Sequence, residues 1–312
     1  MSKYRHQLPL KSGQPFITDA GLETELIFKE NYDLPEFASF PLLKNEKGRE
    51  DIKAYFAHYF DIAQQQQTGL LLEAPTWRAS SEWGNKLNYN ADELAEFNQQ
   101  AILLLDELRT NAQLKSDCVI SGCIGPRYDG YNPEQYMTTE EAEDYHYTQI
   151  KTFSETNADL VTALTMTSIN EALGVTRAAK KLDMPVVISF TTETDGKLPS
   201  GETLQHAIET IDKETYAYPF YYMINCAHPT HFQSELKSDH MWLKRIGGVR
   251  ANASCKSHAE LDESTELDSG NPKELGQQYK HLKSRLTNMH VLGGCCGTSH
   301  QHISEMAHAC FS

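Results

Sequence analysis

Two adjacent cysteines, Cys295 and Cys296, stand between glycines near the end of the chain, in the run 293–298. Adjacent cysteines are poorly placed to form a disulfide with each other, because so small a ring distorts the preferred geometry of the bridge. Two neighbouring thiolates can instead bind one metal ion, which then needs a third ligand. The apolar residues 289–292 predict a short buried strand, and residues 299–303 predict the start of a helix. The cysteine pair is therefore expected at the C-terminal end of a strand.

The composition favours one large intracellular domain. The chain has 312 residues, of which 39% are hydrophobic, and we expect a single domain over residues 1–312. It has no run of about 18 apolar residues and no apolar signal segment at its start, which favours a cytoplasmic protein without a membrane partner. The net charge of −15 is spread along the chain and argues against a nucleic-acid partner. Seven cysteines, an odd number, favour free thiols and metal binding over a disulfide framework.

Eight apolar segments of strand length recur along the chain, and most are separated by helical patterns. The segments cover residues 16–21, 70–77, 118–125, 158–166, 185–192, 221–229, 245–252 and 289–292. Helical patterns cover residues 51–67, 91–112 and 168–182 and begin again at 138–141, whereas the acidic stretch 253–269 is expected to form a loop. Eight strand signals, in a chain longer than the ~250 residues typical of the fold, predict a TIM (β/α)8 barrel. A doubly wound open sheet is the alternative, but it would leave the first and last strand ends far apart.

Polar residues stand at the expected C-terminal strand ends, which is where TIM barrels carry their chemistry. They are Asp19, Glu73, Asn225, Cys226, Cys295 and Cys296. Because these residues follow the first, second, sixth and eighth strands, a barrel would bring them to one mouth. The turn-rich loop 125–131 after the third strand is expected to close over that site.

With these motifs the chain resembles the homocysteine S-methyltransferase family of zinc-dependent TIM-barrel enzymes. The resemblance covers nearly the whole chain. It is carried by TDAGLETEL at 18–26, GCIGP at 122–126, INC at 224–226 and, most specifically, GGCCGT at 293–298. The resemblance implies that Cys226, Cys295 and Cys296 bind Zn²⁺, so that Cys226 is the third ligand.

The implied reaction is methyl transfer to a thiol. A catalytic zinc commonly keeps three protein ligands and one open position, which here would receive a substrate thiol. Coordination converts that thiol, whose pKa is otherwise about 8.5, into the nucleophilic thiolate. The expected partners are a small thiol acceptor and a small methyl donor of the S-methylmethionine or S-adenosylmethionine type, and homocysteine giving methionine is the default acceptor. The chain length leaves no room for additional folate- or cobalamin-binding modules, which favours a freely diffusing donor.

The substrate residues follow the family only in part. By resemblance, Asp19 with the backbone of Ala20 and Gly21 would hold the ends of the amino acid, and Asn225 would orient the neighbouring ligand. Family members generally place a glutamate where this chain has Leu164, which cannot pair with an ammonium group. A second departure is Arg78, where the family usually has a neutral polar or aromatic residue.

These two departures concern the substrate more than the reaction. We hypothesise that the acceptor or the donor differs from homocysteine or S-methylmethionine, with an acid that lacks an α-amino group as one choice. A guanidinium at Arg78 would repel a cationic donor unless it binds a carboxylate, although a surface or structural role is favoured for this residue. Glu73 is the alternative to a changed substrate, because a carboxylate on the second strand could reach the amino group that Leu164 cannot.

Two other functions remain open at this point. One is a barrel that binds zinc or a thiol without catalysis, and the other is a redox protein with a disulfide between Cys295 and Cys296. The remaining cysteines, Cys118, Cys123, Cys255 and Cys310, are expected to be packed or incidental thiols. The sequence predicts no oligomeric state.

Overall fold

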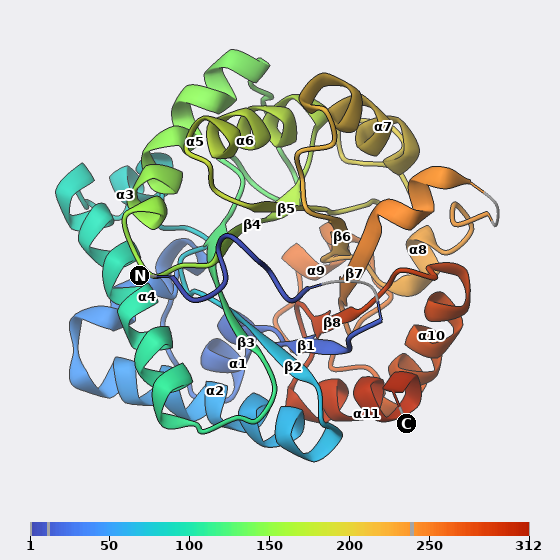
Figure 1. Cartoon of the computed structure of the whole chain (residues 1–312), viewed down its shortest axis with the longest axis horizontal. Coiled ribbons are helices and arrows are strands. Elements are labelled where there is room, and N and C mark those ends of the chain that lie inside the picture. Colours follow the sequence, from blue (N-terminus) through green and yellow to red (C-terminus); the bar gives the residue numbers. More distant parts are fainter. Residues whose placement is uncertain (1, 11–12, 238–239, 312) are drawn as a thin grey trace.

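Eight parallel strands form a closed barrel in the computed structural model, which describes residues 2–10, 13–237 and 240–311. Each strand pairs with the next along the chain, and β1 pairs with β8 to close the ring. The view in Figure 1 shows the strands at the centre with helices around them. The prediction of a TIM (β/α)8 barrel is therefore confirmed, and the open-sheet alternative is wrong.

The strands coincide with the eight predicted apolar segments. They are β1 (Phe16–Thr18), β2 (Gly69–Glu73), β3 (Cys118–Ile124), β4 (Leu160–Met166), β5 (Val186–Phe190), β6 (Tyr222–Asn225), β7 (Ile246–Ala251) and β8 (Val291–Gly294). The apolar segments run past the strands into the loops at the barrel mouth, so β6 ends at Asn225 and leaves Cys226 outside the strand. β8 begins two residues later than predicted, and Cys295 follows its last residue, as expected.

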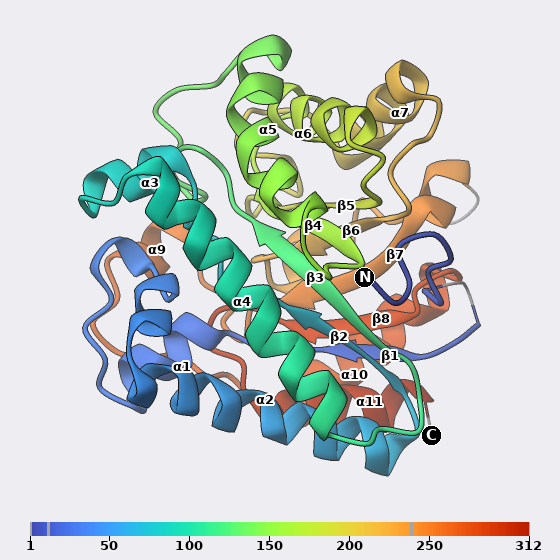
Figure 2. The same cartoon turned by 60° about the vertical axis from the view of Figure 1, so that its left-hand side comes forward.

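Helices cover the outside of the barrel. They are α1 (Leu22–Phe28), α2 (Glu46–Gln66), α3 (Ser81–Lys86), α4 (Ala91–Asn111), α5 (Thr139–Ser154), α6 (Ile169–Lys181), α7 (Leu204–Thr215), α8 (Pro229–Phe232), α9 (His258–Asp262), α10 (Pro272–Arg285) and α11 (His300–Phe311), with 3-10 turns at Pro35–Phe37, Phe40–Lys44 and Met241–Arg245. Figure 2 shows α4 running alongside β3. The prediction that 253–269 is entirely loop is wrong, because Ser257 caps the short helix α9 through a capping box with Glu260.

Side chains that point into the barrel form an apolar layer with a polar layer above it. The lower layer contains Phe16, Leu71, Val119, Leu160, Val187, Met223 and Val291. Because strand side chains alternate, the residues two positions further along point inward as well. Most of these are polar, namely Thr18, Glu73, Ser121, Thr162, Ser189 and Asn225. The barrel thus has an apolar floor and a polar interior towards the C-terminal strand ends.

The N-terminal segment covers the end of the barrel opposite the cysteines. Leu8 and Leu10 are buried against the lower apolar layer. The guanidinium of Arg5 donates hydrogen bonds to the carbonyl oxygens of Ser154, Thr156 and Ala158, which ties this segment to the loop before β4. A small molecule therefore has its route to the polar interior at the C-terminal mouth.

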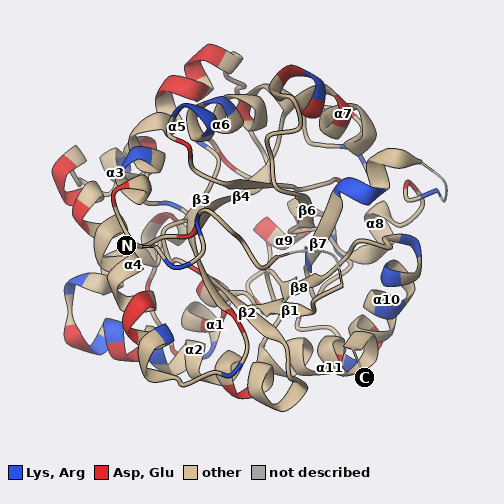
Figure 3. Ribbon diagram, in the orientation of Figure 1, with Lys and Arg blue, Asp and Glu red and all other residues tan. Residues whose placement is uncertain are grey.

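Charged residues lie mostly on the outer helices, as Figure 3 shows. This distribution places the net charge of −15 largely on the surface. Among the residues that the structure describes, no helix is both long and apolar enough to cross a membrane.

Candidate metal centre and substrate pocket

Three sulfur atoms meet at the barrel mouth. The Sγ atoms of Cys226, Cys295 and Cys296 all lie within 4.8 Å of one another. Cys226 and Cys295 are joined by a disulfide, and Cys296 carries a free thiol. The other five cysteines are free, as the preference for free thiols over a disulfide framework predicts, and the Cys226–Cys295 bridge was not predicted. Sulfurs held this close can form a bond as well as share a cation. The bridge joins the residues that directly follow β6 and β8, so the vicinal disulfide between Cys295 and Cys296 is absent.

The three-sulfur cluster fits a metal ion by the chemistry of its donors. Three thiolates are a usual ligand set for Zn²⁺ in proteins, and their closeness lets one ion contact all three. Both sulfurs of the bridge must be reduced before they can serve as ligands. Burial raises the pKa of Cys296 to about 11, so a nearby cation is needed to hold this residue as a thiolate near neutral pH.

The backbone at Cys226 is held from both sides. Its φ of 53° is in the left-handed region, which is uncommon for a residue with a side chain and is often found at functional sites. The carbonyl oxygen of Cys226 accepts hydrogen bonds from Asn252 Nδ2 at 3.0 Å and from His258 Nε2 at 2.8 Å. These contacts, neither of them predicted, compensate for the unfavourable conformation.

Two glycines make the backbone around Cys295 possible. A Cβ on Gly21 would lie 2.6 Å from the carbonyl oxygen of Cys295, so only glycine lets α1 begin this close to the cysteine pair. Gly297 has a φ of +78°, and a Cβ there would lie 2.6 Å from the carbonyl oxygen of Asp268. Gly21 and Gly297, each from a different motif, thus make room for the turn that presents the cysteines.

The loop after β3 reaches the cluster through Tyr131. Its hydroxyl donates to Cys296 Sγ at 3.3 Å, and its ring stacks on His258 with 4.1 Å between the centroids. The sequence predicted that residues 125–131 close over the site, and the structure confirms this. Sequence reasoning missed the particular residue, since nothing in a turn-rich segment distinguishes a tyrosine that points inward from one that points outward.

Asn225 positions the neighbouring segment of β4. Its Oδ1 accepts from the backbone N–H of Thr165 at 2.8 Å and from Ser189 Oγ at 2.6 Å. Its Nδ2 donates to Thr165 Oγ1 at 2.8 Å, and that hydroxyl lies 3.8 Å from Cys226 Sγ. Thr165 has a φ of 62° beside a register shift in β4, so this network holds an irregular strand end against the cysteine.

Asp19 is occupied by protein partners. Its Oδ1 lies 2.9 Å from Arg250 Nη1 and accepts from Thr18 Oγ1, while its Oδ2 accepts from Tyr55 Oη at 3.2 Å. The N–H of Ala20 donates to the same tyrosine hydroxyl at 3.1 Å. Arg250 was not predicted as a site residue. Gly248 of β7 pairs with Val291 of the lower inward layer, and side chains alternate along a strand, so Arg250 two residues later also points inward.

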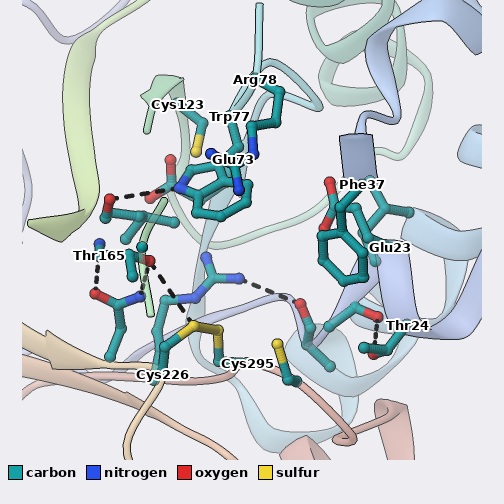
Figure 4. Close-up of a pocket in the computed structure, with 18 of the residues that line it drawn as sticks. Glu23, Thr24, Phe37, Glu73, Trp77, Arg78, Cys123, Thr165, Cys226 and Cys295 are labelled. Atoms are coloured by element: carbon teal, nitrogen blue, oxygen red, sulfur yellow. Dashed lines mark hydrogen bonds between the residues drawn. A yellow bond between two sulfur atoms is a disulfide. The ribbon is translucent and has the colours of Figure 1, made fainter. Parts of the chain in front are cut away.

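All ten predicted site residues line one cavity of about 210 Å³ at the mouth. They are Asp19, Ala20, Gly21, Glu73, Arg78, Leu164, Asn225, Cys226, Cys295 and Cys296. Figure 4 shows the Cys226–Cys295 pair and Glu73 in this cavity, with Phe37 and Glu23 across from them. Five of the lining residues are acidic and two are basic, so the cavity favours a cationic ligand.

Arg78 is buried, so of the expected surface or structural role the surface position is wrong. Its guanidinium lies over the rings of Trp77 and Trp83, at 4.1 Å and 3.4 Å from their centroids, and 3.6 Å from Asp129. Burial lowers the pKa of Arg78 to about 10, so it remains charged near neutral pH. Its Nε has no hydrogen-bond partner within the described part of the chain.

A closed parallel barrel with three cysteine sulfurs beside a cavity at its mouth defines the class: a (β/α)8 barrel with a three-cysteine cluster suited to a metal ion. The family model described as homocysteine S-methyltransferase matches residues 16–310. The chain therefore belongs to the homocysteine S-methyltransferase family.

The chain is also similar to individual proteins, at sequence identities of 15% to 23%. Homocysteine S-methyltransferase 1 of Arabidopsis thaliana is 23% identical over 195 residues, which cover 59% of this chain and 55% of that protein, little more than half its length. The homocysteine methyltransferase MmuM of Escherichia coli in its oxidized form has a TM-score of 0.74 at 15% identity, covering 94% of both chains. Its metallated form has a TM-score of 0.72 at 15% identity, covering 95% of this chain and 96% of that one. These two structures show the shared fold.

Proposed function

We propose that this chain transfers a methyl group from a small sulfonium or ammonium donor to a thiol bound beside Cys226, Cys295 and Cys296, with Zn²⁺ as the metal. The approach of three sulfurs to within 4.8 Å at the cavity wall carries the proposal. When bound, zinc would act as a Lewis acid that keeps the acceptor thiol ionised at neutral pH. Homocysteine, which would give methionine, is the default acceptor.

The chain's own residues would position the reactants and exclude water. Asn225 and Thr165 fix the segment against Cys226, and Tyr131 covers Cys296 from the loop above. Such placement accounts for much of the rate in reactions that need no further acid or base. Asp19, already paired with Arg250, would act mainly by its negative charge, and the backbone of Ala20 and Gly21 would contact the amino-acid end of a substrate.

Arg78 would bind a substrate carboxylate. Its buried Nε lacks a partner, and the group lies at the cavity wall with its charge only partly compensated by Asp129 at 3.6 Å. The surplus of acidic side chains around the rest of the cavity would attract the cationic methyl donor. Homocysteine and S-methylmethionine each carry a carboxylate with which Arg78 would pair.

Methyl transfer to a thiol can be tested directly with reduced protein loaded with zinc. Homocysteine is offered with S-methylmethionine, S-adenosylmethionine or betaine, and methylated product is measured by mass spectrometry. Cys226→Ala should lose both the bound zinc and the product, whereas Cys255→Ala, at an exposed cysteine outside the cluster, should keep both. Full turnover by Cys226→Ala would contradict the proposal. Zinc and thiol binding without product from any donor would instead indicate a binding protein.

A further inference from the structure

Glu73 is a buried carboxyl group without a hydrogen-bond partner. It is the last residue of β2, it is 4% exposed, and it lines the cavity at the mouth. Neither of its carboxylate oxygens accepts a hydrogen bond from any residue that the structure describes. Burying such a group without a partner costs a few kcal/mol, and most buried polar groups in proteins are paired. Because this unpaired carboxyl group faces a cavity, we infer that a ligand supplies its hydrogen bonds.

The cation that could pair with Glu73, Arg250, is already engaged. Arg250 donates to Gly294 O, Thr18 Oγ1 and Ala20 O, in addition to its ion pair with Asp19. On the adjoining strands, the Ser121 and Thr162 hydroxyls share one hydrogen bond at 2.8 Å, which leaves one hydroxyl proton beside Glu73. The protein therefore supplies Glu73 with the charge of Arg250 and at most one neutral hydroxyl donor, but with no cationic donor.

The other acidic groups of the cavity are less suited to bind a cation. Both oxygens of Asp19 have protein partners, and Glu23 Oε1 accepts from Ser39 Oγ at 2.7 Å. Asp129 accepts two backbone N–H groups of its own loop and faces Arg78. Asp262 is exposed to solvent. Among the buried acids at this site, Glu73 is the one with two free acceptor oxygens.

The missing donors define the chemical class of the ligand. A sulfonium or a quaternary ammonium group carries positive charge but no N–H, so it would leave the oxygens of Glu73 without hydrogen bonds. A primary ammonium group has three N–H donors on a compact charge and satisfies a carboxylate directly. The ligand group that fits Glu73 is therefore a primary ammonium.

The depth of Glu73 assigns this ammonium to the acceptor. Glu73 and Asn225 belong to the polar layer of the barrel, and Cys226 lies one residue beyond that layer, towards the mouth. A thiol held at the cysteines can extend its other end inward to Glu73. The donor must approach from the open mouth, because the opposite end of the barrel is covered by Leu8 and Leu10.

We propose that Glu73 binds the primary ammonium group of the thiol acceptor and so selects an amino thiol over the same thiol without the amine. This inference rests on the proposed function only in treating the bound thiol as the methyl acceptor. The selectivity itself concerns binding and needs no turnover. It gives β2 the cation-binding role that the apolar side chain of Leu164, which lines the same cavity, cannot perform. It also removes the need for a substrate that lacks an α-amino group.

The experiment compares two thiols that differ only in the amine. Homocysteine and 4-sulfanylbutanoate are titrated into reduced, zinc-loaded protein, and each dissociation constant is measured by calorimetry. We expect the native chain to bind homocysteine about 100-fold more tightly, the range found for buried, hydrogen-bonded charge pairs. Glu73→Gln should remove this preference by weakening homocysteine alone, and Glu73→Asp should keep part of it. Zinc content reports whether each variant has folded.

Glu23→Gln is the matched control, because it removes a carboxylate from the same cavity that already has a protein partner. It should change the two dissociation constants by the same factor. A preference for homocysteine that survives in Glu73→Gln overturns the inference, and so does a native chain that binds both thiols equally. If the preference depends on Glu73 but no donor yields product, the inference stands and the methyltransferase proposal fails.

Discussion

Replacing Glu73 by glutamine should stabilise the metal-free fold, and the gain should grow with pH. Burial, opposed by the charge of Arg250, raises the pKa of Glu73 from its ordinary 4.5 to about 7. A raised pKa means that the folded state holds the proton more tightly than the unfolded state. The folded state is therefore favoured most below about pH 4.5 and loses stability as the pH rises towards 7. Glutamine has a similar shape and never ionises, so Glu73→Gln escapes this loss.

The size of the effect follows from the difference between the two pKa values. That difference is about 2.5, and each unit corresponds to about 1.4 kcal/mol, which gives a total of about 3 kcal/mol. About 2.5 kcal/mol of it develops between pH 5 and pH 8, because the unfolded carboxyl is already partly ionised at pH 5. With a urea dependence of about 3 kcal/mol per molar, the midpoint of unfolding should rise by roughly 0.8 M more at pH 8 than at pH 5.

No other group that faces Glu73 should mimic this dependence. Burial raises the pKa of Cys123 and of Tyr221 well above the range of the titration, so both stay neutral. The pKa of Arg250 is raised by Asp19 and Glu73 despite its burial, so Arg250 stays charged throughout. The ion pair between Asp19 and Arg250 is present in both proteins. The difference between native chain and variant therefore isolates Glu73.

Equilibrium unfolding in urea, with reductant and a chelator present, measures this difference at several pH values. Glu141→Gln provides a control of opposite sign, because hydrogen bonds from Thr138 lower the pKa of Glu141 in the capping box of α5. That variant should lose stability at pH 8 and recover the native value as the pH falls. A Glu73→Gln effect that is flat between pH 5 and pH 8, or a variant less stable than the native chain at pH 8, would refute the reasoning.

Three further predictions concern the cluster. Oxidation of the zinc-loaded protein with diamide should form the Cys226–Cys295 bridge and release the metal, followed with a coloured chelator and reversed by dithiothreitol; retention of zinc after oxidation would exclude that pair as ligands. Tyr131→Phe, which removes the hydrogen bond to Cys296, should weaken zinc binding about tenfold in competition titrations, and an unchanged affinity would argue against that contact. Asn225→Ala should weaken it by about 10- to 100-fold, and native affinity would show that the strand end holds its shape unaided.

The barrel could be predicted because its signal is local. Strands covered on both faces read as continuous apolar runs, and eight such runs with helices between them leave few arrangements. The predicted strand ends were less accurate, because apolar residues continue into the loops. The sixth segment, for example, was predicted to extend past Cys226, whereas β6 ends at Asn225. The short helix α9 was missed because its stretch is acidic and polar, and only the capping box of Ser257 and Glu260 marks it.

The site could be predicted only in part, because its network joins residues far apart in the chain. Cys295 and Cys296 are adjacent in sequence, so the pair could be recognised directly. The third sulfur, that of Cys226, was predicted only from the family resemblance. The contacts of Tyr131 and Arg250 span more than one hundred residues, and no local pattern indicates them. A bridge between Cys226 and Cys295 depends on how near two loops come, which composition does not encode.

Glu73 shows why a residue's type is less informative than its partners. From the sequence, an acid at a strand end predicts either a structural ion pair or a ligand site. The contacts of Arg250 favour the ligand site, because its guanidinium pairs with Asp19, Thr18 and backbone oxygens and makes no hydrogen bond to Glu73. An inward-facing arginine that is satisfied elsewhere leaves the carboxylate both buried and free. The stability that Glu73 costs above pH 5 and the ammonium selectivity proposed for it therefore have one origin, and glutamine should remove both together.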